Sequence, residues 1–140
     1  MADPISKLVA TAGAEIGETR YACSITTGDH TLVADEPAPE GADAGPSPFG
    51  LLLSSLGACT AITLRMYAER KSWPLRAVRV HLAFRWVGEG AERAPHIDRS
   101  VKLDGPLDAE QRARCAEIAE KTPVTRALKS GIQITTRLAE

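Results

Sequence analysis

The feature that most constrains the fold of this chain is a long apolar segment that opens with a helix start signal. Ser47 can cap a helix, and Pro48 after it suits the first helical position. The apolar run continues to about Lys71, and Pro74 stops it because proline cannot continue the hydrogen-bond ladder. The pattern therefore predicts one helix from about residue 48 to about residue 71, with a cysteine near its middle.

Apolar residues cover more than one face of this helix. A helix of this kind belongs in the interior of an assembly, and because one small sheet can cover only part of it, we expect a second copy of the chain to cover the rest. Gly57 in mid-helix costs about 1 kcal/mol relative to alanine, which predicts close approach by the backbone of a neighbour. The first apolar row comprises Leu52, Leu56, Cys59, Thr63 and Met66, and the second comprises Leu53, Gly57, Leu64 and Ala68.

Strands are predicted on both sides of the helix. Ahead of it, Arg20–Thr26 and Thr31–Asp35 are expected to form a hairpin, because Gly28 supplies the positive φ that a tight turn needs. Behind it, apolar and polar residues alternate over Val78–Trp86, which predicts a half-buried strand. After a loop over residues 88–95, a less regular strand over Ile97–Leu103 is expected to return.

The C-terminal part contains two helix signals and a final alternating segment. Asp108 with Gln111 resembles a capping box and opens a helix expected to end near residue 121. Thr122, which a proline follows, can cap a short helix through residue 128. Ile132–Leu138 alternates as a last strand, and Ile5–Thr11 gives a weaker strand pattern at the opposite end of the chain.

This order of elements, β-β-β-α-β-β-α-β, indicates an α+β fold. Consecutive strands joined by short turns pair mainly antiparallel, unlike those of a doubly wound sheet. A chain of 140 residues is long enough for one domain with a core and hardly for two. We therefore expect a single domain over residues 1–140, with antiparallel sheets around a long central helix.

Charge, motifs and cysteine usage argue against several classes of function. The net charge is −1 without blocks of like charge, which argues against a nucleic-acid-binding protein. No run approaches the ~20 apolar residues of a membrane helix, and no secretory signal is visible. Cys23, Cys59 and Cys115 form no close pair, so we expect free thiols in the cytoplasm. Metal-ligand spacing and glycine-rich phosphate loops are absent, so no metal, nucleotide or flavin cofactor is implied.

Four segments carry a resemblance to a known family. The central one runs from Ser47-Pro48 to Ala58-Cys59-Thr60, and the others cover residues 30–37, 63–75 and 121–128. Together they resemble the OsmC/Ohr family of cysteine-based hydroperoxide reductases, over about residues 5–139. The family pattern is Asn/Ser-Pro, then a Glu in Glu-Leu-Leu, then Ala-Cys-Thr/Phe on a central helix, with Lys-Cys-Pro-Val-His-Arg-Thr-Leu near the C-terminus.

The resemblance implies an intertwined homodimer with active sites at the subunit interface. In the family, the first cysteine reacts with an organic hydroperoxide and becomes a sulfenic acid, the second closes a disulfide, and a thiol or dithiol reductant reopens it. An arginine from the N-terminal strands, held by the motif Glu, keeps the first cysteine as thiolate. The resemblance makes Cys59 the first cysteine and Arg20 the best candidate for the arginine, with Arg65 and Arg126 as alternates.

Two positions depart from the family pattern. Thr122 stands where the family has its second cysteine, and Gly50 stands where it has the motif Glu. A threonine hydroxyl cannot form a disulfide, and a glycine cannot orient an arginine. The chain therefore resembles an OsmC-like subgroup lacking the second cysteine. Cys115 lies two helical turns, ~10 Å, from position 122, so we do not expect it to replace the missing partner.

Each candidate residue also has a structural interpretation. Cys59 can be a small buried hydrophobe, as most free cysteines are. Arg20 can be a solvated charge at a strand edge, and Thr122 can be a helix cap that also lines the pocket opposite the cysteine. Phe49 and Met66 can wall an apolar pocket or belong to the core.

The sequence leaves two functions to be distinguished. The first is reduction of organic hydroperoxides with Cys59 as the peroxidatic nucleophile and an external thiol as reductant. A nearby cation has to activate this thiol, because the helix dipole acts only within the first turn. The second is a non-catalytic binder of a small apolar ligand in a dimer-interface pocket, which the changes at Gly50 and Thr122 widen and make less polar.

Overall fold

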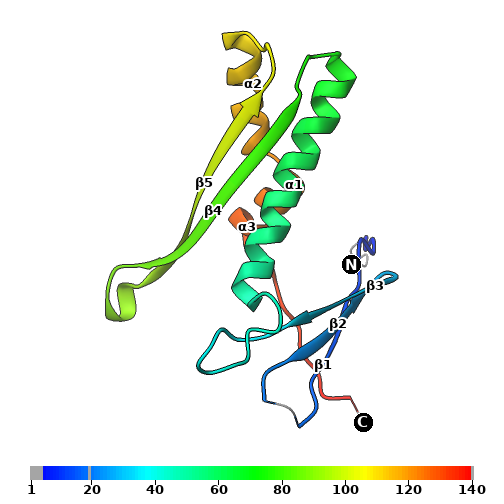
Figure 1. Ribbon diagram of the computed structural model, residues 1–140, viewed down its shortest axis with the longest axis vertical. Helices are drawn as coiled ribbons and strands as arrows, with labels where there is room; N and C mark the ends of the chain where they lie inside the picture. Colours follow the sequence, from blue (N-terminus) through cyan, green and yellow to red (C-terminus); the bar gives the residue numbers. More distant parts are fainter. Residues whose placement is uncertain (1–4, 19, 140) are drawn as a thin grey trace. The chain divides into compact units, whose positions relative to one another are not determined.

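The computed structural model describes residues 5–18 and 20–139, and their contacts divide the chain into two compact units (Figure 1). The first unit ends at Leu51, and the second begins at Leu52. The first holds three short strands and the start of the long helix, and the second holds the rest of that helix, a strand hairpin and two shorter helices. A site built from residues beyond Leu51 therefore lies within one unit.

The first unit is a three-stranded antiparallel sheet in the order β1-β2-β3. Its strands are β1 (Gly13–Glu15), β2 (Cys23–Thr27) and β3 (His30–Ala34). The predicted hairpin is confirmed, with a two-residue turn in which Gly28 adopts a φ of 58°. The predicted strand over Ile5–Thr11 is wrong, because β2 pairs only with residues 13–15 on this side and residues 5–12 have no strand.

The long helix α1 (Pro48–Lys71) has the bounds that the sequence predicts. The Ser47 hydroxyl accepts a hydrogen bond of 3.0 Å from the Gly50 N–H, so the serine caps the first turn. At the other end Ser72 adopts a φ of 56°, and the Trp73 N–H donates back to a carbonyl of the last turn. Both ends of α1 are therefore set by local chemistry.

One stripe of α1 is buried, and a glycine within it allows the hairpin to approach closely. A Cβ atom placed on Gly57 would lie 2.9 Å from Cδ1 of Leu82, so a neighbour approaches closely here with a side chain, and not with its backbone as predicted. The buried residues of the helix are Leu56, Gly57, Thr60, Leu64 and Ala68.

The second unit contains an antiparallel hairpin of β4 (Ala77–Val87) and β5 (Ala94–Asp104). Both predicted strands are confirmed, but pairing continues to Ala94, so the connecting loop is shorter than the predicted one over residues 88–95. Alternate residues of a strand share a face, so four cross-strand pairs form one row toward the core. These pairs are Val78 with Leu103, Val80 with Val101, Leu82 with Arg99, and Phe84 with Ile97.

Two shorter helices complete the second unit. α2 (Ala109–Ala119) begins with the predicted capping box, in which the Gln111 N–H donates to the Asp108 carboxylate at 2.8 Å. The Asp108 N–H donates in turn to the Gln111 side chain at 3.0 Å. α3 (Pro123–Ser130) follows, and Gly131 ends it with a φ of 81°. The predicted short helix is therefore confirmed.

The core of the second unit lies between α1, the hairpin and α2. Leu64 of α1 meets Cys115 and Ile118 of α2 there. Partly buried side chains surround this cluster, namely Tyr67, Trp73, Val78, Val101 and Leu103. An adjoining cluster contains Ala68, Leu75 and Leu107. The sequence expectation of an α+β fold with antiparallel sheets and one long helix is confirmed.

The predicted final strand over Ile132–Leu138 is wrong. Residues 131–139 follow α3 without secondary structure, and the side chains of Ile134 and Leu138 are 85% and 97% exposed. Alternation of apolar and polar residues makes a strand only where a neighbouring strand supplies hydrogen bonds. Within the described residues, none pairs with this segment.

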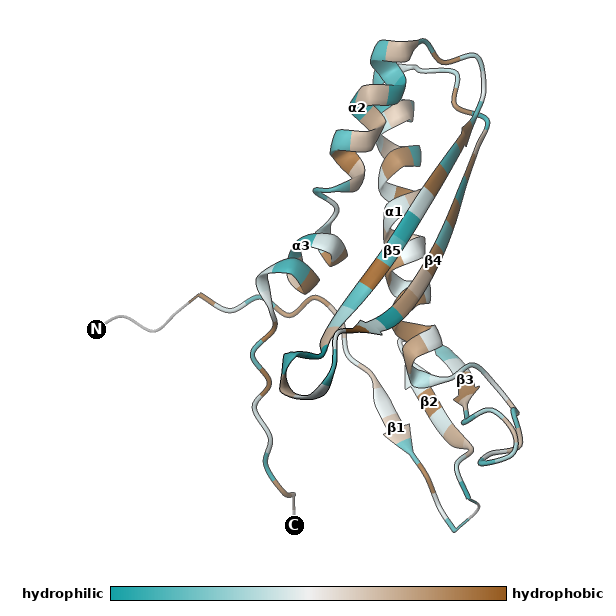
Figure 2. Ribbon diagram, turned by 90° about the vertical axis from the view of Figure 1, so that its left-hand side faces the viewer, coloured by the Kyte–Doolittle hydropathy of each residue, from teal (hydrophilic) through white to brown (hydrophobic). Residues whose placement is uncertain are grey.

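Among the described residues, several apolar side chains of α1 are exposed; Figure 2 colours the ribbon of this helix by hydropathy. Ile62 and Met66 are each 57% exposed. By length and composition α1 is apolar enough to cross a membrane, so the expectation that no run approaches that length is too strong. The core helix of a soluble protein has the same properties, and α1 packs its buried stripe against the hairpin and α2.

Candidate functional site

Cys59 lies in the middle of α1 and is half-buried. Its Sγ lies 4.0 Å from the hydroxyl of Thr63, one turn further along. The next residue, Thr60, is fully buried, whereas Cys59 lies at the flank of the stripe, on the same side as Leu52 and Leu56. The thiol is therefore partly accessible, unlike that of a core cysteine.

A largely buried arginine, Arg99, lies beside this part of α1. Nη1 of Arg99 donates to the hydroxyls of Thr60 at 3.0 Å and Thr125 at 2.8 Å. Its Nη2 donates to the carbonyl of Ala119 at 2.9 Å and lies 3.8 Å from the Glu120 carboxylate. The Arg99 side chain is only 12% exposed, so these partners hold a positive charge inside the unit.

Thr122 belongs to the same polar cluster. It is fully buried at the N-cap position of α3, but its hydroxyl does not cap the helix. The hydroxyl instead forms a hydrogen bond of 2.6 Å with the hydroxyl of Thr125. Its predicted position at the start of α3 is thus confirmed, and its predicted capping bond is wrong, because the Thr125 side chain competes for the hydroxyl.

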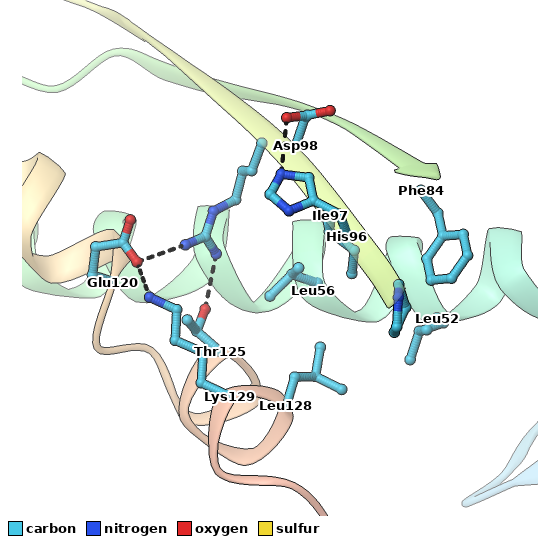
Figure 3. Close-up of a pocket in the computed structure, with 12 residues that line it drawn as sticks. Leu52, Leu56, Phe84, His96, Ile97, Asp98, Glu120, Thr125, Leu128 and Lys129 are labelled. Carbon is cyan, nitrogen blue, oxygen red and sulfur yellow. Dashed lines mark hydrogen bonds and ion pairs between the residues drawn. The ribbon is translucent and has the colours of Figure 1, made fainter. Parts of the chain in front are cut away.

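A cavity of about 640 Å³ opens between α1, the hairpin and α3 (Figure 3). Its lining is mixed: Glu120 and Lys129 lie at one end and Leu52 and Phe84 at the other, while His96 and Asp98 also line it between these ends. Leu52 and Leu56 contribute the helix side of this lining, so the cavity borders the flank of α1 that also bears Cys59. The apolar part consists of Leu52, Leu56, Phe84, Pro95, Ile97 and Leu128.

Ion pairs around two carboxylates mark the charged part of the cavity. Glu120 lies between Lys129 and the guanidinium of Arg99 (Figure 3). The hydrogen bond from Lys129 holds the pKa of the Glu120 carboxyl below its usual range. Asp98 accepts hydrogen bonds from Arg85, which lower its pKa. Both carboxylates are therefore ionised at neutral pH.

The predicted arginines occupy different environments. Arg20 belongs to the first unit, where it is exposed and its guanidinium lies 5.2 Å from the centre of the Tyr21 ring. Arg65 donates to the backbone carbonyls of Leu75 and Arg76, which ties α1 to the start of the hairpin. Arg126 is exposed on α3. The role of Arg20 at the thiol stays a prediction, and Arg65 has a structural role.

The remaining predicted pocket residues are distributed over both units. Gly50 and Phe49 lie in the first turn of α1, within the first unit, and Phe49 is 49% exposed. Met66 is exposed on α1 in the second unit and does not line the cavity. Thr122 does not line it either, since its neighbour Thr125 provides the wall. A role of Gly50, Phe49, Met66 and Thr122 in the predicted dimer-interface pocket stays a prediction.

The other two cysteines differ from Cys59. Cys115 is 2% exposed in the core, and burial raises the pKa of its thiol. Cys23 is half-buried on β2, as expected for a sheet residue. Among the described residues, no group of three His, Cys, Asp or Glu side chains is arranged to hold a metal ion. The accessible thiol of the second unit is therefore that of Cys59.

Arg99 was not among the candidates drawn from the sequence, although the pattern contains a signal for it. Ile97, Arg99, Val101 and Leu103 alternate along one face of β5, and the other three are apolar. An arginine in an inward-facing row needs buried acceptors. The threonines and the carbonyl that accept from it come from three other segments, so their convergence follows from the tertiary fold.

The fold and this thiol together define a class of protein: an antiparallel α+β fold with a half-buried cysteine on a long central helix. The family model described as OsmC-like protein matches residues 41–137. The chain belongs to the OsmC-like protein family.

Solved structures show the same fold at low sequence identity. An OsmC-like protein from Mycoplasma pneumoniae superimposes with a TM-score of 0.76 at 16% identity, covering 89% of each chain. An organic hydroperoxide resistance protein OsmC from Legionella pneumophila has a TM-score of 0.66 at 19% identity, covering 89% of this chain and 92% of that one. The organic hydroperoxide resistance protein OhrB of Bacillus subtilis has a TM-score of 0.58 at 20% identity, covering 85% of this chain and 89% of that one. No curated protein sequence matches this chain.

Proposed function

We propose that this protein reduces organic hydroperoxides, with Cys59 as the peroxidatic nucleophile and a small external thiol as reductant. The observation that carries the proposal is the half-buried thiol on α1, which the sequence resemblance aligns with the family's first cysteine. Membership of the OsmC-like family and the fold shared with hydroperoxide resistance proteins support it. We place the reaction in the cytoplasm, where such thiols stay reduced.

The proposed reaction has three balanced steps. The Cys59 thiolate attacks one peroxide oxygen, the O–O bond breaks, and the alcohol leaves after it takes a proton. This leaves a sulfenic acid on the cysteine. One molecule of external thiol then forms a mixed disulfide with Cys59 and releases water. A second molecule breaks that disulfide, restoring the Cys59 thiol and releasing the oxidised reductant.

The two departures from the family pattern, Thr122 and Gly50, determine how this cycle runs. The Thr122 hydroxyl cannot close a disulfide, and Cys115 is buried in the core with a raised pKa, so the resolving thiol comes from solution. Arg20 is proposed as the cation that keeps Cys59 ionised. With glycine at position 50, no carboxylate holds this arginine in place, so we expect slower oxidation than in a family member that has the motif Glu.

We also propose that the chain forms a homodimer. The exposed apolar residues of α1, including Ile62 and Met66, support this assembly because apolar surface of this kind is stabilised by burial. The family resemblance adds that the two chains intertwine and that the active sites lie at their interface.

A second candidate function is non-catalytic binding of a small apolar ligand. The cavity of about 640 Å³ favours it, because this volume falls within the range of ligand pockets, about 300 to 1,000 Å³. Its apolar wall includes Leu52 and Leu128. This function requires no reaction at Cys59. A turnover assay therefore distinguishes the two candidate functions.

The experiment that tests the first proposal is a turnover assay with cumene hydroperoxide and dithiothreitol. The wild-type protein is expected to consume peroxide and oxidise one dithiol per peroxide. Cys59→Ser should abolish this activity, and the matched variant Cys115→Ser should retain it, because Cys115 is a buried core residue. Wild-type turnover no faster than that of Cys59→Ser would refute the proposal and leave ligand binding as the function.

A further inference from the structure

The cavity of the second unit combines an apolar wall with a pair of cations. We propose that it binds an apolar monocarboxylate, whose chain lies along Leu52, Phe84 and Leu128 and whose carboxylate replaces that of Glu120 between Arg99 and Lys129. The inference rests on the second candidate function, ligand binding in this cavity, and requires no reaction of the Cys59 thiol. It adds the chemical class of the ligand and the residues that recognise it.

The first argument is that the site already holds a carboxylate. One oxygen of Glu120, Oε2, lies 3.8 Å from Nη2 of Arg99 and also accepts a hydrogen bond from Nζ of Lys129. The position between these two cations therefore suits a carboxylate oxygen. A ligand carboxylate placed there would make the same contacts without a change in the protein framework.

The second argument is that Arg99 is held in place, whereas the Glu120 carboxylate beside it is exposed. Arg99 is 12% exposed and fixed by hydrogen bonds to three protein oxygens. Glu120 is 58% exposed at the end of α2, so its side chain can turn into water while the arginine stays in place. A fixed cation with a displaceable internal carboxylate is the arrangement expected of a carboxylate-binding site.

The third argument is the balance of charge around the cavity. Among the residues that line the cavity, Arg99 and Lys129 supply two positive charges beside the carboxylate of Glu120, and the other lining carboxylate, Asp98, is paired with Arg85 outside the lining. Asp98 is already paired with Arg85 at 2.7 Å. One excess positive charge therefore remains beside the Glu120 carboxylate, and a monocarboxylate would neutralise it.

The fourth argument is the separation of polar and apolar lining. Glu120, Thr125 and Lys129 lie at one end of the cavity, and Leu52 and Phe84 lie at the other (Figure 3). A ligand with a charged head and an apolar body matches this division, because each part then meets groups of its own kind. A neutral apolar ligand would leave the cationic end unused.

The experiment is isothermal titration calorimetry of the full chain with decanoate, decanol and decyltrimethylammonium at neutral pH. Decanoate is expected to bind at least about tenfold more tightly than decanol, because hydrogen bonds to charged groups are the stronger ones. Decyltrimethylammonium should bind more weakly than decanol. Cys59→Ser should bind decanoate like the wild type, which separates this inference from the thiol chemistry.

Two variants provide the decisive comparison, since each removes one partner of the same ion pair. Lys129→Gln removes a cation and should weaken decanoate binding roughly threefold or more, whereas Glu120→Gln removes the competing carboxylate and should tighten it roughly two- to fivefold. Lys102→Gln, a matched change on exposed β5 outside the cavity, should leave the Kd unchanged. Variants at Lys129 and Glu120 that shift the Kd in the same direction would overturn the proposal.

Equal binding of decanoate and decanol would also overturn the proposal, while leaving apolar ligand binding as a function of the cavity. No binding of either compound would refute both the inference and the second candidate function. Neither result would affect the proposed reaction at Cys59, which the turnover assay tests separately.

Discussion

Nη1 of Arg99 on β5 donates a hydrogen bond of 2.8 Å to the hydroxyl of Thr125 on α3. The same nitrogen reaches Thr60 on α1, and Nη2 reaches the carbonyl of Ala119 at the end of α2. One guanidinium thus connects a strand to three helices. Because its partners lie in the interior, its loss leaves buried acceptors with fewer donors.

Replacement of Arg99 should therefore destabilise the protein strongly. Arg99→Met keeps most of the side-chain volume and should lower the free energy of unfolding by about 2 to 4 kcal/mol. Urea unfolding followed by circular dichroism measures this change. The matched control Lys102→Met changes an exposed residue of the same strand and should stay within about 0.5 kcal/mol of the wild type. Similar values for the two variants would contradict the structural role of Arg99.

Thr122 should contribute to stability through its hydroxyl group. Thr122→Val keeps the shape of the side chain but loses the hydrogen bond of 2.6 Å with Thr125, so the free energy of unfolding should fall by about 1 to 2 kcal/mol. Thr122→Ser retains the hydroxyl and should recover the part of this loss that comes from the hydrogen bond. Urea titrations of both variants measure the difference. A valine variant as stable as the wild type would show that this hydrogen bond contributes nothing.

Gly50 offers a stabilising substitution in the first turn of α1. Gly50→Glu should raise the free energy of unfolding by about 1 kcal/mol, because it removes a helix glycine and completes a capping box with Ser47 near the positive end of the helix dipole. A Cβ atom there would lie 3.2 Å from the Ser47 hydroxyl, which therefore has to move slightly. A comparison of the Tm of Gly50→Glu with that of Gly50→Ala distinguishes the effect of the carboxylate from the effect of helix propensity. A lower Tm for both variants would mean that the serine cannot adjust.

The loop before α1 should lose order in acid. The buried Asp35 carboxylate accepts from the N–H groups of Glu36 at 2.7 Å, Ala44 at 3.1 Å and Ala42 at 3.3 Å, and these bonds, led by that of Ala44, lower its pKa. A carboxyl whose pKa is lower in the folded state stabilises that state above its unfolded pKa of about 3.9. This stabilisation is lost as the pH falls below that value toward the folded pKa.

Amide chemical shifts test this pH dependence directly. The N–H signals of Ala42 and Ala44 should move together as the pH is lowered below about 4, the range set by the unfolded carboxyl. Asp35→Asn has no carboxyl at this position, so its two amides should show no such transition. An identical transition in the variant would assign the change to another group.

The elements that the sequence predicts well are those with local causes. α1 begins at a serine cap and ends where Ser72 adopts a positive φ, and α2 begins with the Asp108–Gln111 capping box. The predictions of strands over residues 5–11 and 132–138 are wrong because a strand needs a hydrogen-bonding partner elsewhere in space. Local alternation of apolar and polar residues does not reveal such a partner.

The candidate site shows the same contrast between features with local causes and features that depend on the tertiary fold. Cys59 is visible from its local motif, and a close approach at Gly57 follows from the cost of a mid-helix glycine, although a side chain makes it and not a backbone. The cluster around Arg99 depends on four segments that meet only after folding, so no single stretch of sequence indicates it. The hydroxyl of Thr122 likewise bonds to Thr125 instead of capping α3, because burial decides between two local partners.

The most direct test of the central claim is the rate of Cys59 oxidation by cumene hydroperoxide and by hydrogen peroxide, followed by intact-mass spectrometry with Cys59→Ser as control. We predict fast addition of one oxygen atom at Cys59, faster with the organic peroxide, and a mixed disulfide when a small thiol is added. Oxidation no faster than that of an exposed free cysteine, with either peroxide, would contradict the account and leave the cavity as a ligand-binding site.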